Sequence, residues 1–222
     1  SISRLSAEAV ERGLREAQAR GLTVSCDLNF RKKLWRWEPG TAPRDLAERT
    51  MRRLLPMVNV LIANEEDAAD VLGIRAPGTD VEAGRLAVDR YPEVAREIVR
   101  QFPNLRYVAI TLRESISADH NNWGGMLYDA ASGSAVFAPM RDGRYSPYEI
   151  RDIVDRIGGG DAFGAGLIYA LRTPELAAPA TAVAFAVAAS CLAHSILGDY
   201  NLVSRAEVEA LMKGSGTGRV QR

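Results

Sequence analysis

The chain has 222 residues, of which 47% are hydrophobic and 25% are charged, and its formal net charge is zero. This length can bury a substantial core, and one domain is its simplest arrangement. The balanced charge provides no basic field, which argues against nucleic acid or an anionic membrane as a partner. Cys26 and Cys191 lie far apart in apolar contexts, which is typical of buried thiols in a reducing, cytoplasmic compartment.

Two further features limit the class of protein. His120 and His194 have no partners at metal-ligand spacing, so the sequence indicates no His/Cys metal site. The uncharged run 176–197 is mostly alanine and contains Pro179, which favours a buried helix over a membrane span. No secretory signal is visible.

The first third of the chain predicts two strands, each followed by polar residues. Ser6 can cap a helix that runs to Arg20, and a buried strand follows over 22–26. Next come Asp27, Asn29 and Arg31, which alternate and would share a side in an extended segment. They form either a recognition strip for an anionic small molecule or a turn leading into the basic surface patch 31–33.

The second predicted strand also ends in polar residues. A helix is predicted over 43–55 and a strand over 58–63. Asn64 can cap the next helix, which runs to Gly73, with Asp67 among the acidic residues of its first turn. Read without further context, this is an ordinary helix start.

The middle of the chain predicts loop, helix and hairpin. Segment 74–106 is charged and broken by prolines and glycines, with a short helix over 94–102. A strand over 107–112 contains Thr111 and leads to Arg113. A hairpin joins 126–129 to 134–138 through the turn 130–133, and Trp123 is assigned to the core.

The most informative stretch is 152–172. The apolar, β-branched residues Ile153, Val154 and Ile157 predict an extended segment over 153–157. The glycines 158–160 then break it. A helix follows in which Phe163, Leu167, Ala170 and Leu171 share a buried face. Glycine amides at a helix start suit an anion such as phosphate, and Asp161 beside them suits a general base. The alternative is that Asp161 is only an N-cap and the glycines form a tight turn.

The last part of the chain is helical. An alanine-rich helix spans about 181–195, and Asn201 follows in a loop. Ser204 and Glu207 form a capping box that opens the last helix, which ends near Met212. Strands and helices alternate throughout, which predicts an α/β fold with a mostly parallel central sheet covered on both faces. We expect one α/β domain over 1–213 and a mobile tail over 214–222.

Residues 155–163, Asp-Arg-Ile-Gly-Gly-Gly-Asp-Ala-Phe, resemble the signature Asp-Thr-x-Gly-Ala-Gly-Asp-x-Phe of the ribokinase-like (PfkB-type) carbohydrate kinases. Arg156 replaces the usual Thr, and Gly159 replaces the usual Ala. The stretch 27–35, Asp-Leu-Asn-Phe-Arg-Lys-Lys-Leu-Trp, is similar to 2-keto-3-deoxygluconate kinases in particular. The resemblance implies a three-layer α/β/α fold. It also implies that an N-terminal part with a β lid is absent from this chain.

The resemblance also implies site roles. Asp161 would be the catalytic base, and the amides of Gly158, Gly159 and Gly160 would form the anion hole. Arg31 would bind a sugar-acid carboxylate, with Asn29 and Asp27 as further substrate contacts. The nucleotide candidates are Asn64, Thr111, Arg113 and Asn201. The metal candidates are Asp67, which is one methylene shorter than the family's Glu, and Asp155.

The function implied is ATP- and Mg²⁺-dependent phosphorylation of a sugar or sugar-acid hydroxyl, with 2-keto-3-deoxygluconate preferred. Fructokinase, ribokinase or nucleoside kinase activity is the alternative substrate class. A nucleotide-binding fragment without catalysis, or a purely structural α/β domain, would be a different class of function. The expected partners are the sugar and ATP, and a homo-oligomer is possible.

Overall fold

A computed structural model describes residues 2–64, 66–74 and 88–214. The described residues form two compact units. Unit 1 contains those within Ser1–Gly78, Asp89–Val108 and Tyr128–Ser134, and unit 2 contains those within Thr79–Val88, Ala109–Leu127 and Ala135–Arg222. One α/β domain over 1–213 stays a prediction. The predicted tail lies outside the described residues, except for Gly214.

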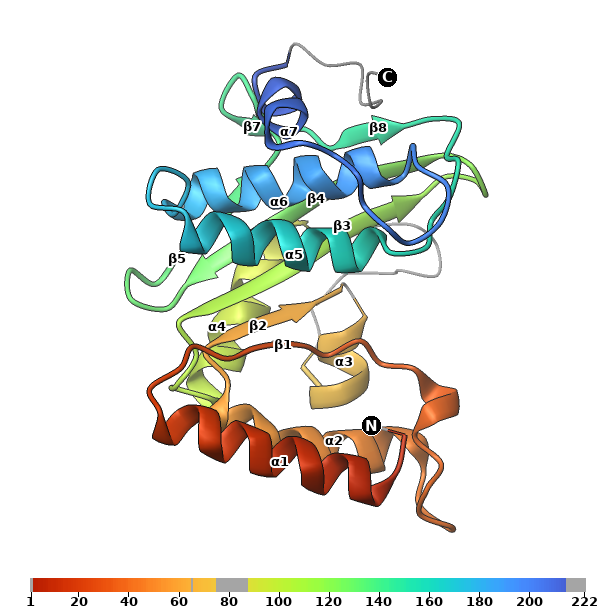
Figure 1. Cartoon of the computed structure of the whole chain (residues 1–222), viewed down its shortest axis with the longest axis vertical. Coiled ribbons are helices and arrows are strands. Elements are labelled where there is room, and N and C mark those ends of the chain that lie inside the picture. Colours follow the sequence, from red (N-terminus) through yellow and green to blue (C-terminus); the bar gives the residue numbers. More distant parts are fainter. Residues whose placement is uncertain (1, 65, 75–87, 215–222) are drawn as a thin grey trace. The chain divides into compact units, whose positions relative to one another are not determined.

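Unit 1 opens with two amphipathic helices, α1 (Arg4–Ala19) and α2 (Pro43–Leu54) (Figure 1). The cap of α1 is Ser3, whose Oγ accepts a hydrogen bond from the Ser6 N–H over 3.0 Å. The predicted cap at Ser6 is therefore wrong, because Ser6 is the donor in this interaction. Helix α2 begins with Pro43, whose missing N–H costs nothing at a first helical position. The short helices η1 (Lys32–Leu34) and η2 (Leu55–Met57) precede and follow α2.

Two parallel strands position the polar loops of unit 1. Strand β1 (Ser25–Asp27) pairs with β2 (Val60–Ala63), with Cys26 opposite Leu61 and Asp27 opposite Ile62. Strand β1 begins later than predicted. The Val24 N–H donates to the Asn59 side chain over 2.9 Å. Because the strands are parallel, the segments after Asp27 and after Ala63 leave from the same edge of the sheet.

Two more helices complete unit 1. Helix α3 (Asp67–Leu72) ends at Gly73, which adopts a left-handed conformation with φ of 70°. This is the usual helix stop at glycine, because no Cβ opposes a positive φ. Helix α4 (Tyr91–Gln101) follows the short helix η3 (Val88–Arg90) and starts slightly before the predicted position.

Unit 2 contains an antiparallel region of sheet. Strands β3 (Tyr107–Ser115) and β4 (Asn121–Asp129) are longer than predicted, and β5 (Ser134–Ala138) follows β4 as expected. Strand β8 (Tyr148–Ile150) pairs antiparallel with β4, and β6 (Met140–Arg141) pairs antiparallel with β7 (Arg144–Tyr145). With the parallel β1–β2 pair, the fold is α/β with mixed strand pairing. The predicted extended segment 153–157 contains no strand.

Helices α5 (Gly159–Arg172) and α6 (Pro179–Ala193) lie side by side in unit 2 (Figure 1). Phe163, Leu167 and Ala170 are fully buried, as the spacing predicts, whereas Leu171 is half-buried. A Cβ at Gly166 would lie 3.1 Å from the Ala186 Cα, so glycine permits this close helix contact.

Helix α7 (Arg205–Met212) has the predicted capping box. The Ser204 N–H donates to Glu207 Oε2 over 2.8 Å, and the Glu207 N–H donates to Ser204 Oγ over 3.3 Å. Among the helices of the described residues, none has the length and apolarity needed to cross a bilayer.

Candidate active site

The polar segment after β1 turns sharply. Asp27 Oδ1 accepts a hydrogen bond from the Asn29 N–H over 3.0 Å, and Asn29 has a φ of 37°. This is the turn that Asp and Asn favour, because their side chains bond backbone amides two residues away and tolerate positive φ. The prediction that Asp27, Asn29 and Arg31 share one side of an extended segment is therefore wrong. All three residues are exposed.

The segment after β2 forms a compact helix start. Asn64 Oδ1 accepts hydrogen bonds from the Glu66 and Asp67 N–H groups, each over 2.8 Å. In return, Asp67 Oδ2 accepts one from the Asn64 N–H over 3.1 Å. The N-cap residue of α3 (Asp67–Leu72) is Glu66, so the N-cap predicted at Asn64 lies two residues too early. Asn64 and Asp67 nevertheless form a reciprocal pair of hydrogen bonds of the capping-box type.

Asp67 joins the two segments. Its Oδ1 accepts a hydrogen bond from the Phe30 N–H over 3.0 Å, and the residue is only 4% exposed. Burial raises the pKa of Asp67, against the opposing effects of the two backbone N–H donors and of the Arg31 charge. The structure thus brings together the predicted substrate segment 27–31, the predicted nucleotide residue Asn64 and the predicted metal residue Asp67.

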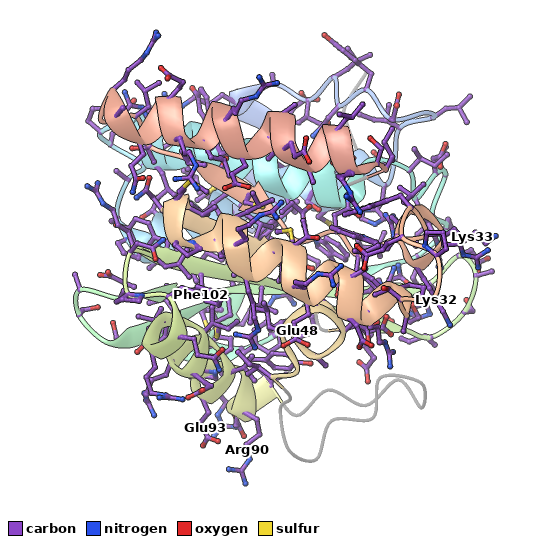
Figure 2. All side chains as sticks on the ribbon, turned by 90° about the horizontal axis from the view of Figure 1, so that it is seen from below. Lys32, Lys33, Glu48, Arg90, Glu93 and Phe102 are labelled. Carbon is purple, nitrogen blue, oxygen red and sulfur yellow. The ribbon has the colours of Figure 1, made fainter. Side chains whose placement is uncertain are left out.

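The basic residues after Arg31 lie on the surface. Lys32 and Lys33 are exposed, and Figure 2 shows their side chains extending outward from η1. Trp35, which ends the motif, is buried and anchors this segment in the core of unit 1. The turn and the exposed cations agree with the interpretation as a turn that leads into a basic surface patch, and substrate recognition by this segment stays a prediction.

In unit 2, the glycine motif forms the start of α5. Gly158 is the N-cap residue in a left-handed conformation with φ of 77°, and the helix begins at Gly159. Asp161 is therefore the third helical residue, so the alternative interpretation of Asp161 as the N-cap is wrong. Its side chain is exposed. A Cβ at Gly158 would lie 2.9 Å from the Asp199 carbonyl oxygen, so both the conformation and the space require glycine.

Three N–H groups at the start of α5 have no acceptor within the helix. They belong to Gly159, Gly160 and Asp161, because intrahelical bonding starts with the Ala162 N–H, which donates to the Gly158 carbonyl over 2.7 Å. The Gly159 N–H makes a long contact of 3.5 Å with the Arg156 carbonyl. Nothing lies within 4 Å of a Cβ at Gly160. A helix start of this kind suits an anion.

Ser190 of α6 and His194, the C-cap residue of α6, lie next to Gly159. Ser190 Oγ donates to the Gly159 carbonyl over 2.8 Å, and His194 Nδ1 lies 2.8 Å from the Ser190 carbonyl. Burial lowers the pKa of His194, and the charges of Arg156 and Arg113 act in the same direction. In the neutral ring, Nδ1 carries the proton and donates to the carbonyl.

Sequence reasoning missed Ser190 and His194 as site residues. A serine and a histidine four residues apart in an otherwise alanine-rich segment were the available signal. Trp123 packs against His194 with ring centroids 5.0 Å apart, and its predicted place in the core is confirmed.

Asp155 braces the loop before α5. Its Oδ1 accepts from the Ile157 N–H over 2.9 Å and its Oδ2 from the Gly198 N–H over 3.0 Å. These two donors hold the pKa of Asp155 below its usual range. Arg156, at the unusual position of the motif, donates to the Ser117 carbonyl over 2.7 Å.

The predicted nucleotide residues of unit 2 differ in environment. Thr111 is buried in β3, and Arg113 is exposed. Asn201 is a structural brace in its loop, because its Nδ2 donates to the Ala189 carbonyl over 3.2 Å and its Oδ1 accepts from the Val203 N–H over 3.3 Å. Nucleotide binding by these residues stays a prediction.

The predicted metal residues do not form a ligand cluster. Within the described ranges, no three His, Cys, Asp or Glu side chains are grouped so that they could hold an ion. Asp67 and Asp155 each have both carboxylate oxygens bonded to backbone N–H groups. Both carboxylates are thus tied to the backbone, and their metal roles stay predictions.

Comparison with known proteins finds carbohydrate kinases similar to this chain. A 2-dehydro-3-deoxygalactonokinase of Haloferax volcanii is 31% identical over 205 residues, which are 92% of this chain and 52% of that protein. The crystal structure of 2-dehydro-3-deoxygluconokinase from Thermotoga maritima has a TM-score of 0.78 and 39% identity, covering 94% of this chain and 56% of that one. A PfkB family carbohydrate kinase from Listeria grayi has a TM-score of 0.73 and 30% identity, covering 93% and 55%.

The chain is a homologue of PfkB-type carbohydrate kinases. It spans about half the length of these kinases. No model of a protein family matches it. The resemblance inferred from residues 27–35 and 155–163 and the ribokinase-like α/β fold are both confirmed. In this kinase homologue, the signature residues Gly158 and Asp161 lie at the start of α5, and the motif 27–31 follows β1.

Proposed function

We propose that the protein is a carbohydrate kinase that transfers the γ-phosphoryl group of ATP to a hydroxyl of a sugar acid. The observation that carries the proposal is the start of α5, where three N–H groups without intrahelical acceptors adjoin the exposed Asp161 carboxylate. A transferred phosphoryl group needs N–H donors, and its attacking hydroxyl needs a base. The names of the homologous kinases support the same chemistry.

In the proposed reaction, Asp161 accepts the proton of a sugar hydroxyl. The hydroxyl oxygen then bonds to the γ-phosphorus, the bond from that phosphorus to the β-phosphate oxygen breaks, and ADP leaves. The N–H groups of Gly159 and Gly160 stabilise the negative charge on the transferred group. Mg²⁺ would neutralise charge on the ATP phosphates when bound, held mostly by phosphate and water oxygens.

The proposed substrate is 2-keto-3-deoxygluconate, also called 2-dehydro-3-deoxygluconate. The exposed Arg31 guanidinium offers a planar pair of donors, which suits the carboxylate of a sugar acid. A kinase for the neutral sugar fructose, or for a nucleoside, is the alternative. The free thiols of Cys26 and Cys191 agree with a cytoplasmic location, where ATP is also available.

The test is ADP release from the protein with a panel of sugars and sugar acids. We expect turnover with 2-keto-3-deoxygluconate, and a loss of at least about a hundredfold in kcat for Asp161→Asn, because base catalysis contributes about 10²–10⁴-fold. Asp142→Asn changes an exposed Asp of the β6–β7 turn and should leave the rate unchanged. Near-normal turnover of Asp161→Asn would reject the base.

Substrate class is tested with Arg31→Ala. We expect this variant to lose kcat/KM for the sugar acid by about tenfold or more, because a charged hydrogen bond is worth about 1.5–3 kcal/mol. Activity with neutral sugars should change little, and an equal loss on both substrates would refute the sugar-acid assignment.

Calorimetry with ADP and with each sugar separately tests the alternative class of function, a nucleotide-binding fragment without catalysis. ADP binding without sugar binding would favour a nucleotide-binding module.

A further inference from the structure

We propose that Asp67 is a positioning residue for sugar-acid binding, and that it acts by fixing the loop of Arg31 instead of ligating Mg²⁺. The proposal rests on the function proposed above. It assigns to the acidic residue of the Asn64–Asp67 segment a role in substrate specificity. That role follows from its contacts in unit 1.

Asp67 connects two separate segments of unit 1. Its two carboxylate oxygens accept hydrogen bonds from Phe30 and Asn64, which belong to the separate segments that follow β1 and β2. The parallel register of β1 and β2 places both segments at one edge of the sheet. One carboxylate thereby joins two loops that are distant in sequence, because Phe30 and Asp67 are 37 residues apart.

The shape of the loop also depends on Asp67. Asn29 has a φ of 37°, a conformation that non-glycine residues seldom adopt. Two side-chain acceptors hold the turn, Asp27 on the Asn29 N–H and Asp67 on the Phe30 N–H. Phe30 directly precedes Arg31 in the chain. The bond from the Phe30 N–H to Asp67 therefore restrains the backbone next to Arg31.

The surroundings of Asp67 also bear on metal binding. Mg²⁺ takes six oxygens in near-octahedral geometry and keeps several waters, which requires open space around a carboxylate. Asp67 is 4% exposed, and Asn64 Oδ1 already accepts two N–H groups. The short Asp side chain reaches both amides at 3.0 and 3.1 Å, and the extra methylene of Glu would displace the carboxylate from them.

The experiment compares Asp67→Asn, Asp67→Glu and the control Asp70→Asn in steady-state kinetics. Asp70 lies in the same helix and forms an ion pair with Arg44 at the surface. We expect each Asp67 variant to raise KM for 2-keto-3-deoxygluconate about tenfold, the size of one lost charged hydrogen bond. The Mg²⁺ concentration for half-maximal activity should stay within about twofold, and Asp70→Asn should change neither quantity.

The opposite pattern would overturn the proposal. A metal role requires Asp67→Asn to raise the Mg²⁺ requirement strongly, and Asp67→Glu, which restores the family's residue, to keep or lower it. An unchanged KM for the sugar acid in both variants is equally decisive against a positioning role.

Amide hydrogen exchange separates this inference from the proposed function. In the unmodified protein, the Phe30 and Asn64 N–H groups should exchange slowly. Asp67→Ala, which removes both acceptors, should speed exchange at Phe30 by about tenfold or more. Unchanged protection at Phe30 would show that Asp67 does not fix the loop. If the unmodified protein releases no ADP with any sugar, the proposed function fails, but the exchange result still decides the loop contact.

Discussion

Ser190 Oγ donates a hydrogen bond to the Gly159 carbonyl over 2.8 Å, which links α6 to the first residue of α5. Both groups are buried, and His194 Nδ1 donates in turn to the Ser190 carbonyl over 2.8 Å. The amides proposed to receive phosphate therefore belong to a backbone that a side chain of α6 holds in place. Four predictions follow from the packing around this turn.

The first prediction concerns Ser190→Ala. Removing the hydroxyl leaves the buried Gly159 carbonyl without its donor, which should lower the free energy of unfolding by about 1–3 kcal/mol. Because the same change loosens the first turn of α5, KM for ATP should also rise. Urea unfolding and steady-state kinetics measure the two effects. Ser195→Ala, at a half-buried serine just past α6, should cost less than half as much, and equal costs would contradict a special role for Ser190.

The second prediction separates Gly158 from Gly160. Gly158→Ala meets both a positive φ and the Asp199 carbonyl at 2.9 Å, so it should destabilise by at least about 1–2 kcal/mol. Gly160→Ala meets nothing within 4 Å and adds a better helix former, so stability should be unchanged or rise by up to about 1 kcal/mol. Thermal unfolding of the two variants provides the comparison. A Gly158→Ala variant as stable as the unmodified chain would rule out the left-handed N-cap.

Parts of this arrangement follow from local sequence alone. The capping box of Ser204 and Glu207 was predicted because it needs only residues three positions apart. The break at Gly158 was also predicted, because a run of glycines is itself a local signal. The extended segment 153–157 was predicted wrongly: in the structure its amides at Ile153 and Val154 find single acceptors, Asp119 and His194, instead of a strand partner.

Other parts depend on contacts that no local pattern contains. The Asp67 bond to Phe30 requires the parallel register of β1 and β2, which places two loops together. The Ser190 bond to Gly159 spans 31 residues and requires the close packing of α5 on α6. The turn at Asn29 could have been expected from an Asp followed two residues later by Asn, but the alternating pattern favoured an extended segment.

The third prediction explains why this chain has glycine where the kinase signature has alanine. A Cβ at Gly159 would lie 2.9 Å from His194 Cε1, so Gly159→Ala should destabilise by about 1–3 kcal/mol. In a His194→Ala background the ring is gone, and the same change should cost at least about 1 kcal/mol less. A double-mutant cycle in urea measures this coupling. Additive costs for the two substitutions would show that His194 does not determine the residue at 159.

The fourth prediction is a pH dependence that arises from His194. Burial lowers its pKa in the folded protein, while the unfolded chain has the ordinary value of about 6.5. Below about pH 6.5 the unfolded chain therefore binds a proton that the folded protein does not, and stability falls as pH decreases, by at most about 1.4 kcal/mol per pH unit for one proton.

His194→Gln isolates this contribution from that of the acidic residues. Its unfolding free energy should fall less between pH 7 and pH 5 than that of the unmodified chain. Glutamine does not titrate, whereas every carboxylate remains in both proteins. Urea titrations at several pH values measure the difference between the two slopes. Parallel slopes would mean that His194 takes up a proton as readily in the folded protein as in the unfolded chain, which its place between Ser190, Trp123 and Gly159 does not allow.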